Sequence, residues 1–121
     1  MLSKRVKSFG YAIAGIKHVF RTQANMKIHV AVAIAVLICG FVFSISITEW
    51  LVCLLCFGLV LTAEIVNTAI EHVVDLASPN KHPLAKHAKD AAAGAVLVAA
   101  VFAAIAGLLI FVPKGWALLF A

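Results

Sequence analysis

The sequence predicts an all-α integral membrane protein, in which three transmembrane helices follow an N-terminal amphipathic surface helix. Of its 121 residues, 64% are apolar and 12% are charged, whereas soluble domains average about 25% charged residues. Mean hydropathy is +1.11, and three segments approach the roughly 20 apolar residues that a bilayer-crossing helix needs. A chain of this length has room for a single domain, residues 1–121.

Residues 3–22 are predicted to form the amphipathic surface helix. Apolar side chains recur in this segment at steps of three and four, and its basic residues lie elsewhere around the helix. The apolar positions are Val6, Phe9, Ile13, Ile16 and Phe20. Such a helix is expected to lie in the membrane interface. A cleaved signal peptide is not expected, because about two dozen mixed residues precede the first long apolar run.

The first transmembrane helix is expected at residues 28–47 and the second at residues 50–76, with a short loop near residues 48–49 between them. Both segments are apolar over a length that can cross the hydrocarbon. The polar end of the second segment indicates that this helix continues beyond the hydrocarbon.

The loop at residues 77–83 is expected to break the second helix, because it holds two prolines among polar residues. The third helix is then expected at residues 84–112, with Pro83 suited to its first position and His82 or Asn80 near its cap. Small side chains occupy every fourth position of this helix, which permits close packing within the chain or between protomers. They are Ala91, Ala95, Ala99, Ala103 and Gly107.

The distribution of basic residues predicts the orientation of the chain. Nine of the ten lysines and arginines precede the first span or lie between the second and the third. The positive-inside rule places these regions, and therefore the N-terminus, on the cytoplasmic side. Anionic lipid headgroups account for the net charge of +5, so no nucleic-acid partner is expected.

A row of polar side chains interrupts the second helix at Glu64, Asn67, Glu71 and Asp75, and we call it the polar stripe. At about 100° per residue Asn67, Glu71 and Asp75 lie about 60°, 20° and 20° from Glu64, so the four positions share one helix face. Four of the five acidic residues fall in this hairpin, the fourth being Asp90. A carboxylate facing lipid costs several kcal/mol. The stripe is therefore expected to face protein, water or bound cations.

Lys86, Lys89 and Asp90 share a face of the following helix and are expected opposite the polar stripe. Carboxylates for Mg²⁺, lysines for phosphate and a carboxylate base at the membrane boundary are what phosphoryl transfer requires. The chain has neither a P-loop nor a Gly-rich kinase loop. From the residues alone, other interpretations stay open: a small cation or proton transporter, a structural subunit, or a polar seam paired with Lys86 or Lys89.

The five histidines do not form a convincing metal-binding set. We expect His72, which lies beside the polar stripe, to be a hydrogen-bonding group rather than a metal ligand. The three cysteines lie inside the predicted spans and are expected to be small packing residues.

The segments AEIVNTAIEHVVD (63–75) and AKDAAAGAV (88–96) resemble the signature of the prokaryotic diacylglycerol kinase and undecaprenol kinase family, which are small membrane lipid kinases. The similarity covers nearly the whole chain, and HPLAKHAKDAAAGAV is most similar to the Gram-positive, undecaprenol kinase-like branch. The resemblance implies transfer of the ATP γ-phosphoryl group, with Mg²⁺, to a membrane lipid alcohol. Undecaprenol is the expected acceptor and diacylglycerol the alternative. It also implies a homotrimer in the bacterial plasma membrane with cytoplasmic active sites.

The same resemblance assigns roles to individual residues. Glu64 matches the general base for the lipid hydroxyl, and Glu71 matches a carboxylate that holds the divalent cation. Gln23 stands where the family commonly places a second metal-binding glutamate, so weaker metal binding is expected. The expected ATP contacts are Lys4, Tyr11, Asn67, Asp75, Asn80, Lys81, His82, Lys89 and Asp90.

Overall fold

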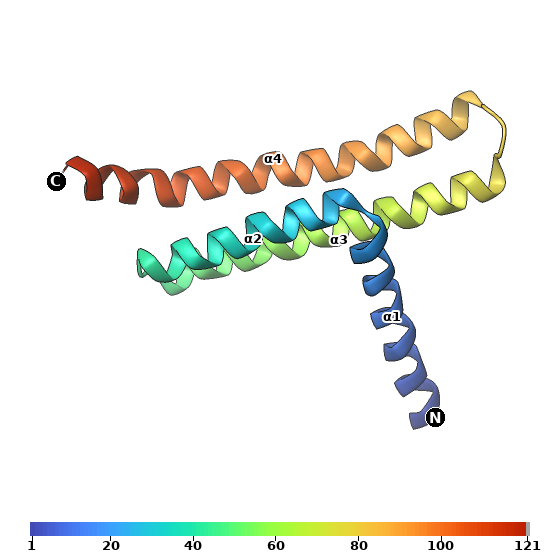
Figure 1. The fold of residues 1–121 in the computed structure, drawn as a ribbon, viewed down its shortest axis with the longest axis horizontal. Coiled ribbons are helices and arrows are strands. Elements are labelled where there is room, and N and C mark those ends of the chain that lie inside the picture. Colours follow the sequence, from blue (N-terminus) through green and yellow to red (C-terminus); the bar gives the residue numbers. More distant parts are fainter. Residues whose placement is uncertain (121) are drawn as a thin grey trace.

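A computed structural model describes residues 1–120 of the chain, and Ala121 lies outside the described part. These residues form four helices and no strand: α1 (Leu2–Thr22), α2 (Ala24–Val42), α3 (Ile47–Ala77) and α4 (Pro83–Phe120). Helices α3 and α4 run antiparallel along most of their length, α2 packs mainly on α3, and α1 projects from the bundle (Figure 1). Within the described part, α2, α3 and α4 are long and apolar enough to cross a membrane, so the predicted fold class is confirmed.

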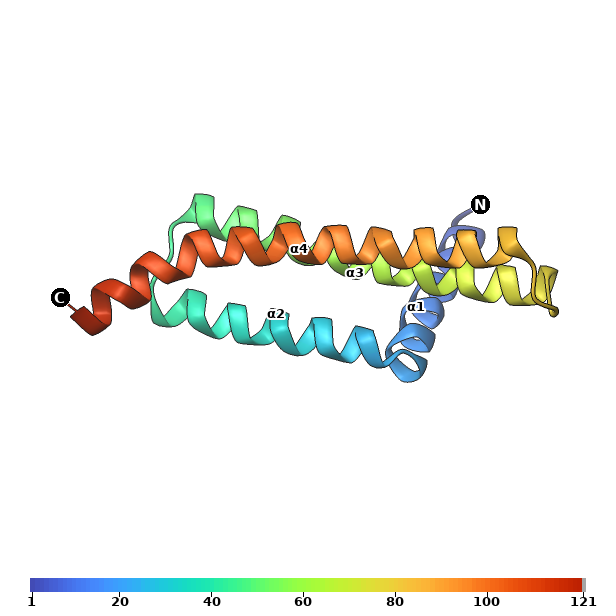
Figure 2. The same ribbon diagram turned by 90° about the horizontal axis from the view of Figure 1, so that it is seen from above.

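All the strongly basic regions lie toward one end of the bundle. Seen from above (Figure 2), α1 and the α3–α4 loop are at this end, whereas the α2–α3 loop and the C-terminus are at the other. Helices α3 and α4 extend past the start of α2 (Figure 1). The last turns of α3 and the first turns of α4 therefore form a two-helix extension beyond the three-helix section.

Helix α1 packs on the bundle only through its C-terminal part, where Val19 is buried. Its apolar face is otherwise exposed; Phe9 and Ile13, for example, are exposed. Gln23 has extended backbone angles and separates α1 from α2, which explains the sharp change of direction (Figure 1). An exposed apolar face of this kind is what a helix at a membrane interface presents to lipid.

The α2–α3 loop spans residues 43–46, so the loop expected near residues 48–49 was misplaced. Helix α2 ends in a Schellman motif: the Ile45 N–H donates to the Gly40 carbonyl at 3.1 Å, and the Ser44 N–H donates to the Phe41 carbonyl at 3.3 Å. The motif requires a left-handed residue after the helix. Ser44 takes that position with φ 50°.

A capping box starts α3 earlier than the predicted start at residue 50. The Ser46 hydroxyl accepts from the Glu49 N–H at 3.1 Å, and the Ser46 N–H donates to the Glu49 carboxylate at 3.0 Å. These two bonds satisfy backbone donors that a helix start otherwise leaves without partners. Helix α3 therefore begins at Ile47.

Helix α4 begins at Pro83, as expected. The His82 side chain caps it, because its Nδ1 accepts from the Leu84 N–H at 3.1 Å. At its other end α4 continues to Phe120, past the predicted end at residue 112 and through Pro113, which removes one helical hydrogen bond.

Two interactions hold α4 against α3. Near the α2–α3 loop, Lys114 Nζ lies 3.0 Å from Glu49 Oε2. In the middle of α4, Ala92, Val96 and Ala99 are buried. The predicted row of small residues only partly coincides with this contact: Ala99 belongs to it, whereas Ala91 and Ala95 remain exposed. Packing within one chain therefore uses one part of that row.

We predict that Ser44→Gly stabilises the protein by up to about 1 kcal/mol, because glycine adopts the left-handed region without the steric cost of a Cβ. The thermal unfolding midpoint in detergent micelles measures the change. Ser46→Ala is the matched control in the same loop: it removes the helix cap and should destabilise the protein by about 1 kcal/mol. A midpoint lowered by Ser44→Gly would contradict the strain at this residue.

Candidate active site

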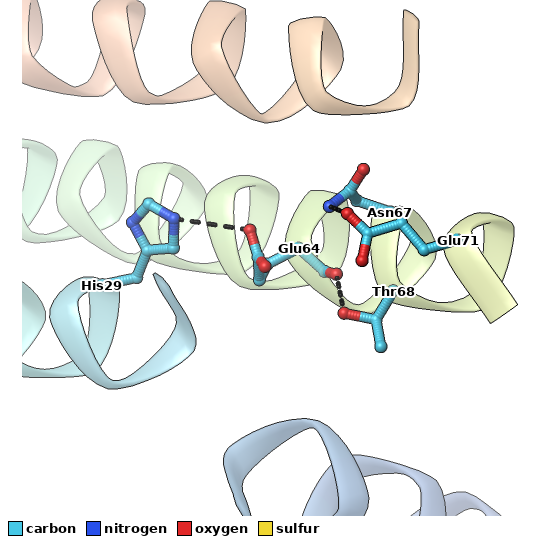
Figure 3. Close-up of polar contacts among 5 residues, drawn as sticks. All are labelled: His29, Glu64, Asn67, Thr68 and Glu71. Carbon is cyan, nitrogen blue, oxygen red and sulfur yellow. Dashed lines mark hydrogen bonds and ion pairs between the residues drawn. The ribbon is translucent and has the colours of Figure 1, made fainter. Parts of the chain in front are cut away.

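Glu64 places a buried carboxylate at the bilayer end of the polar stripe. It is 1% exposed, and neither carboxylate oxygen has a hydrogen-bond partner within residues 1–120. The Nε2 atom of His29 on α2 lies 3.7 Å from Glu64 Oε2 (Figure 3). The neighbouring Thr68 hydroxyl donates to the backbone carbonyl of Glu64 at 2.9 Å rather than to its carboxylate. The carboxylate therefore keeps its capacity to accept a proton or hydrogen bond.

One turn further along α3, Asn67 and Glu71 form a linked pair. The Asn67 side-chain amide donates to Glu71 Oε1 at 3.2 Å (Figure 3). Asn67 is buried and Glu71 is half-buried, and the Asn67 Oδ1 atom has no partner in the described part of the chain. The contact holds the Glu71 carboxylate on the same helix face as Glu64. The polar stripe is thus present as predicted.

The outer end of the stripe meets the lysines of α4. Lys89 Nζ lies 2.5 Å from Asp75 Oδ1, and Lys86 Nζ lies 2.5 Å from Asp90 Oδ2. These groups lie outside the apolar segment 91–112 and are solvent-exposed. Hydrogen bonding to Asp75 raises the pKa of Lys89, and hydrogen bonding to Lys86 lowers the pKa of Asp90. These pKa changes favour the charged forms of Lys89 and Asp90, and exposed ion pairs of this kind contribute little to stability.

A cleft of about 800 Å³ opens between the end of α3 and the start of α4. It brings together most of the residues that the sequence assigned to ATP. Those in its lining are Asp75, Asn80, Lys81, His82, Lys89 and Asp90, and Lys86 lines the cleft as well. The cleft thus holds three lysines beside two carboxylates, a combination suited to a nucleotide with its phosphates.

Asn67, which was also expected to contact ATP, belongs to the polar stripe and not to the cleft lining, and three more predicted site residues lie outside both the cleft and the stripe. Lys4 and Tyr11 are exposed on the projecting part of α1 (Figure 1). Gln23 lies at the α1–α2 junction, where its side-chain amide donates to the Thr22 hydroxyl at 3.3 Å. A single chain therefore does not bring the α1 residues to the α3–α4 cleft.

Comparison with known proteins identifies the chemistry that this arrangement serves. A family model of the prokaryotic diacylglycerol kinases matches residues 10–111. The chain belongs to this family. It is therefore a lipid kinase, and the resemblance noted in its sequence is confirmed.

Three relatives show how the family varies around this chain. The undecaprenol kinase of Bacillus subtilis (strain 168) is 54% identical over 113 residues, which cover 93% of this chain and 92% of that protein. A diacylglycerol kinase of Synechocystis is 43% identical over 107 residues, covering 88% of this chain and 61% of the relative. The diacylglycerol kinase of Escherichia coli K12 is 36% identical over 101 residues, covering 83% and 82%.

The kinase also contains polar contacts that the sequence did not predict. His29 falls in an apolar run of α2, and its contact with Glu64 depends on how α2 is rotated against α3. His72 forms a hydrogen bond, as expected, but its partner is His18 of α1, with the two Nε2 atoms 2.8 Å apart. A histidine in an apolar helix at the depth of a buried carboxylate was the signal that could have indicated the first contact.

A divalent cation would find few ligands in one chain of this kinase. Within residues 1–120 no group of three or more His, Cys, Asp or Glu side chains is arranged to hold a metal ion. Mg²⁺ is commonly bound through one or two carboxylates, and phosphate oxygens and water complete its shell. Glu71 meets this lesser requirement, because Asn67 orients its carboxylate in the part of the stripe between Glu64 and the cleft-lining Asp75.

Proposed function

We propose that this lipid kinase transfers the γ-phosphoryl group of ATP to the hydroxyl of undecaprenol, on the cytoplasmic face of a bacterial plasma membrane. The observation that carries the proposal is the single face of α3 that joins a buried, unpartnered carboxylate at Glu64 to an exposed, lysine-rich cleft. A lipid alcohol and a polar nucleotide need these two environments. Nine of ten basic residues at the cleft end support a cytoplasmic location.

The hydrocarbon chain of the lipid could bind in an apolar cleft beside the polar stripe of α3. An apolar cleft of about 640 Å³ runs between α2, α3 and α4, and His29 is part of its lining. A lipid tail in this cleft would bring its hydroxyl to the His29–Glu64 contact. Glu64 is suited to act as general base there, because its oxygens have no other hydrogen-bond donor among the described residues.

The nucleotide would occupy the α3–α4 cleft with its phosphates directed along the stripe. Glu64 and Glu71 are separated by seven residues, or about 10 Å at 1.5 Å per residue. The γ-phosphoryl group therefore has to lie between these two carboxylates to reach the lipid hydroxyl. Glu71 would hold Mg²⁺, which neutralises phosphate charge during transfer, and Lys89 would bind phosphate oxygens.

The position of α1 supports a homotrimer. Lys4 and Tyr11 lie on the part of α1 that projects away from the chain's own cleft (Figure 1). In an assembly, the projecting helix of one copy can reach the cleft of a neighbour. We therefore propose that each active site combines residues of two protomers, with Lys4 and Tyr11 contacting the neighbour's nucleotide.

We predict that undecaprenol is phosphorylated with a higher kcat/KM than diacylglycerol. This prediction is supported by the sequence identities: the chain is 54% identical to an undecaprenol kinase and 43% and 36% identical to two diacylglycerol kinases. Transfer of labelled phosphate from ATP to each lipid in matched detergent micelles measures the preference. An equal kcat/KM for the two lipids would remove the predicted preference, and a higher value for diacylglycerol would make diacylglycerol the preferred substrate.

Glu64→Gln is expected to lower kcat by about 10²–10⁴-fold, because glutamine cannot accept the hydroxyl proton. ATP affinity should be retained, since Glu64 lies away from the cleft. Glu49→Gln is the matched control, as it alters a carboxylate at the other end of the same helix, where it contacts Lys114. Turnover of Glu64→Gln near wild type, or loss of ATP binding together with turnover, would exclude Glu64 as the base.

Glu71→Gln is expected to reduce activity by orders of magnitude in a folded protein, because the phosphate-bound cation loses its charged ligand. Gln23→Glu supplies a second carboxylate and should lower the Mg²⁺ concentration needed for half-maximal activity. Titration of activity with Mg²⁺ measures both effects. The assignment fails if both variants show the Mg²⁺ dependence of the wild type.

A further inference from the structure

We propose that His29 accepts the substrate proton from Glu64 and passes it to water, so that Glu64 is an ionised base again for the next turnover. The proposal rests on the proposed role of Glu64 as general base. It assigns a function to a histidine that the family signature does not include, and it starts from the contact between α2 and α3 shown in Figure 3.

The geometry of the pair fits proton transfer. His29 Nε2 lies 3.7 Å from Glu64 Oε2, and neither atom has a hydrogen-bond partner among the described residues. An imidazole nitrogen must be unprotonated to accept a proton. Beside the ionised Glu64 carboxylate the His29 tautomer with its proton on Nε2 is favoured. Once Glu64 is protonated this preference is lost, and exchange of the ring proton with water gives the tautomer with a bare Nε2, which can accept from Glu64. Catalytic contacts are often long before substrate binds, and a small side-chain rotation brings this one to hydrogen-bond distance.

The difference in burial indicates the direction of transfer. The Glu64 side chain is 1% exposed and the His29 side chain is 18% exposed. A proton taken up by Glu64 has no direct way to water and would leave the base neutral. Histidine can take a proton at one ring nitrogen and release one from the other near neutral pH. His29 also lies close to the start of α2, two residues after the exposed Lys27.

The complete step is balanced. The lipid O–H bond breaks and its proton moves to Glu64 Oε2, while the lipid oxygen forms a bond to the γ-phosphorus. The bond from this phosphorus to the β–γ bridging oxygen breaks, and its electron pair leaves with ADP. The His29 ring proton exchanges from Nε2 to Nδ1 through water, and the proton of Glu64 then moves from Oε2 to Nε2. The imidazolium loses its Nδ1 proton to water, which leaves an ionised Glu64 and a neutral histidine with its proton on Nε2, as at rest.

A purely structural role makes a different prediction for the same contact. If His29 only compensates the burial of the Glu64 carboxylate, its loss should lower the unfolding midpoint or weaken lipid binding. A proton acceptor instead affects turnover. Substitutions of His29 by asparagine and by alanine separate these roles. Asparagine can still form a hydrogen bond but cannot take up and release a proton near neutral pH, whereas alanine leaves space for a free imidazole.

His29→Asn is expected to lower kcat roughly 10²-fold, with the KM values for lipid and ATP within about twofold of wild type. His29→Ala should lose activity similarly and regain kcat when imidazole is added to the micelles. Wild type and Glu64→Gln, assayed alongside, should not respond to imidazole. Thermal unfolding midpoints are measured for all variants.

A kcat of His29→Asn near wild type would overturn the proposal, as would an effect confined to KM or the absence of imidazole rescue in His29→Ala. The Glu64→Gln assay separates this failure from failure of the proposed base. If Glu64→Gln is inactive while His29→Asn is fully active, only the relay is wrong. If Glu64→Gln is active, the base assignment itself is wrong.

Discussion

Burial of the Glu64 carboxylate among apolar helices constrains the surrounding structure. A charge removed from water costs several kcal/mol unless it has a partner, and within residues 1–120 the Glu64 carboxylate has only the distant Nε2 of His29. The backbone of α3 adds no further donor, because its amides are bonded within the helix. The Glu64 carboxylate oxygens and the nearby Asn67 Oδ1 atom therefore lack hydrogen-bond donors among the described residues. Only a group that brings a donor can complete their hydrogen bonding.

Along the rest of the stripe, the exposure of the side chains to solvent increases with distance from Glu64. Asn67 is buried, Glu71 is half-buried and Asp75 is exposed, all on one face of α3. The first α4 turns add lysines only at the exposed end, where Lys89 contacts Asp75. Cations are thus kept away from Glu64 and gathered where phosphates would lie. The proposed transfer from a highly charged nucleotide to an apolar alcohol would use this separation along one helix face.

Local periodicity explains which parts of this site were predictable. The spacing of Glu64, Asn67, Glu71 and Asp75 is a property of one helix, so the sequence was sufficient to place them on one face. The cap of α4 at His82 was also predictable, because it involves neighbouring residues. The early start of α3 was missed although Ser46 and Glu49 carry the spacing of a capping box.

Contacts between helices were not predictable in the same way. Helix α2 is apolar around most of its circumference, so its sequence does not indicate which face meets α3, and the His29–Glu64 contact stayed hidden. The sequence likewise placed Lys86 and Lys89 together opposite the stripe, but Lys86 pairs with Asp90 within its own helix and only Lys89 reaches α3. Helix rotation and side-chain reach decide these pairings.

The unbroken course of α3 through residues 47–77 has a consequence for how this enzyme family can change in length. Inserting one residue between Glu64 and Glu71 would turn every later side chain by about 100° and move Glu71 and Asp75 off the face that holds Glu64. The same insertion between Ser78 and His82 falls in the loop and leaves the phase of both helices intact. Changes in chain length are therefore tolerable at the loop end of the hairpin and disruptive within the stripe.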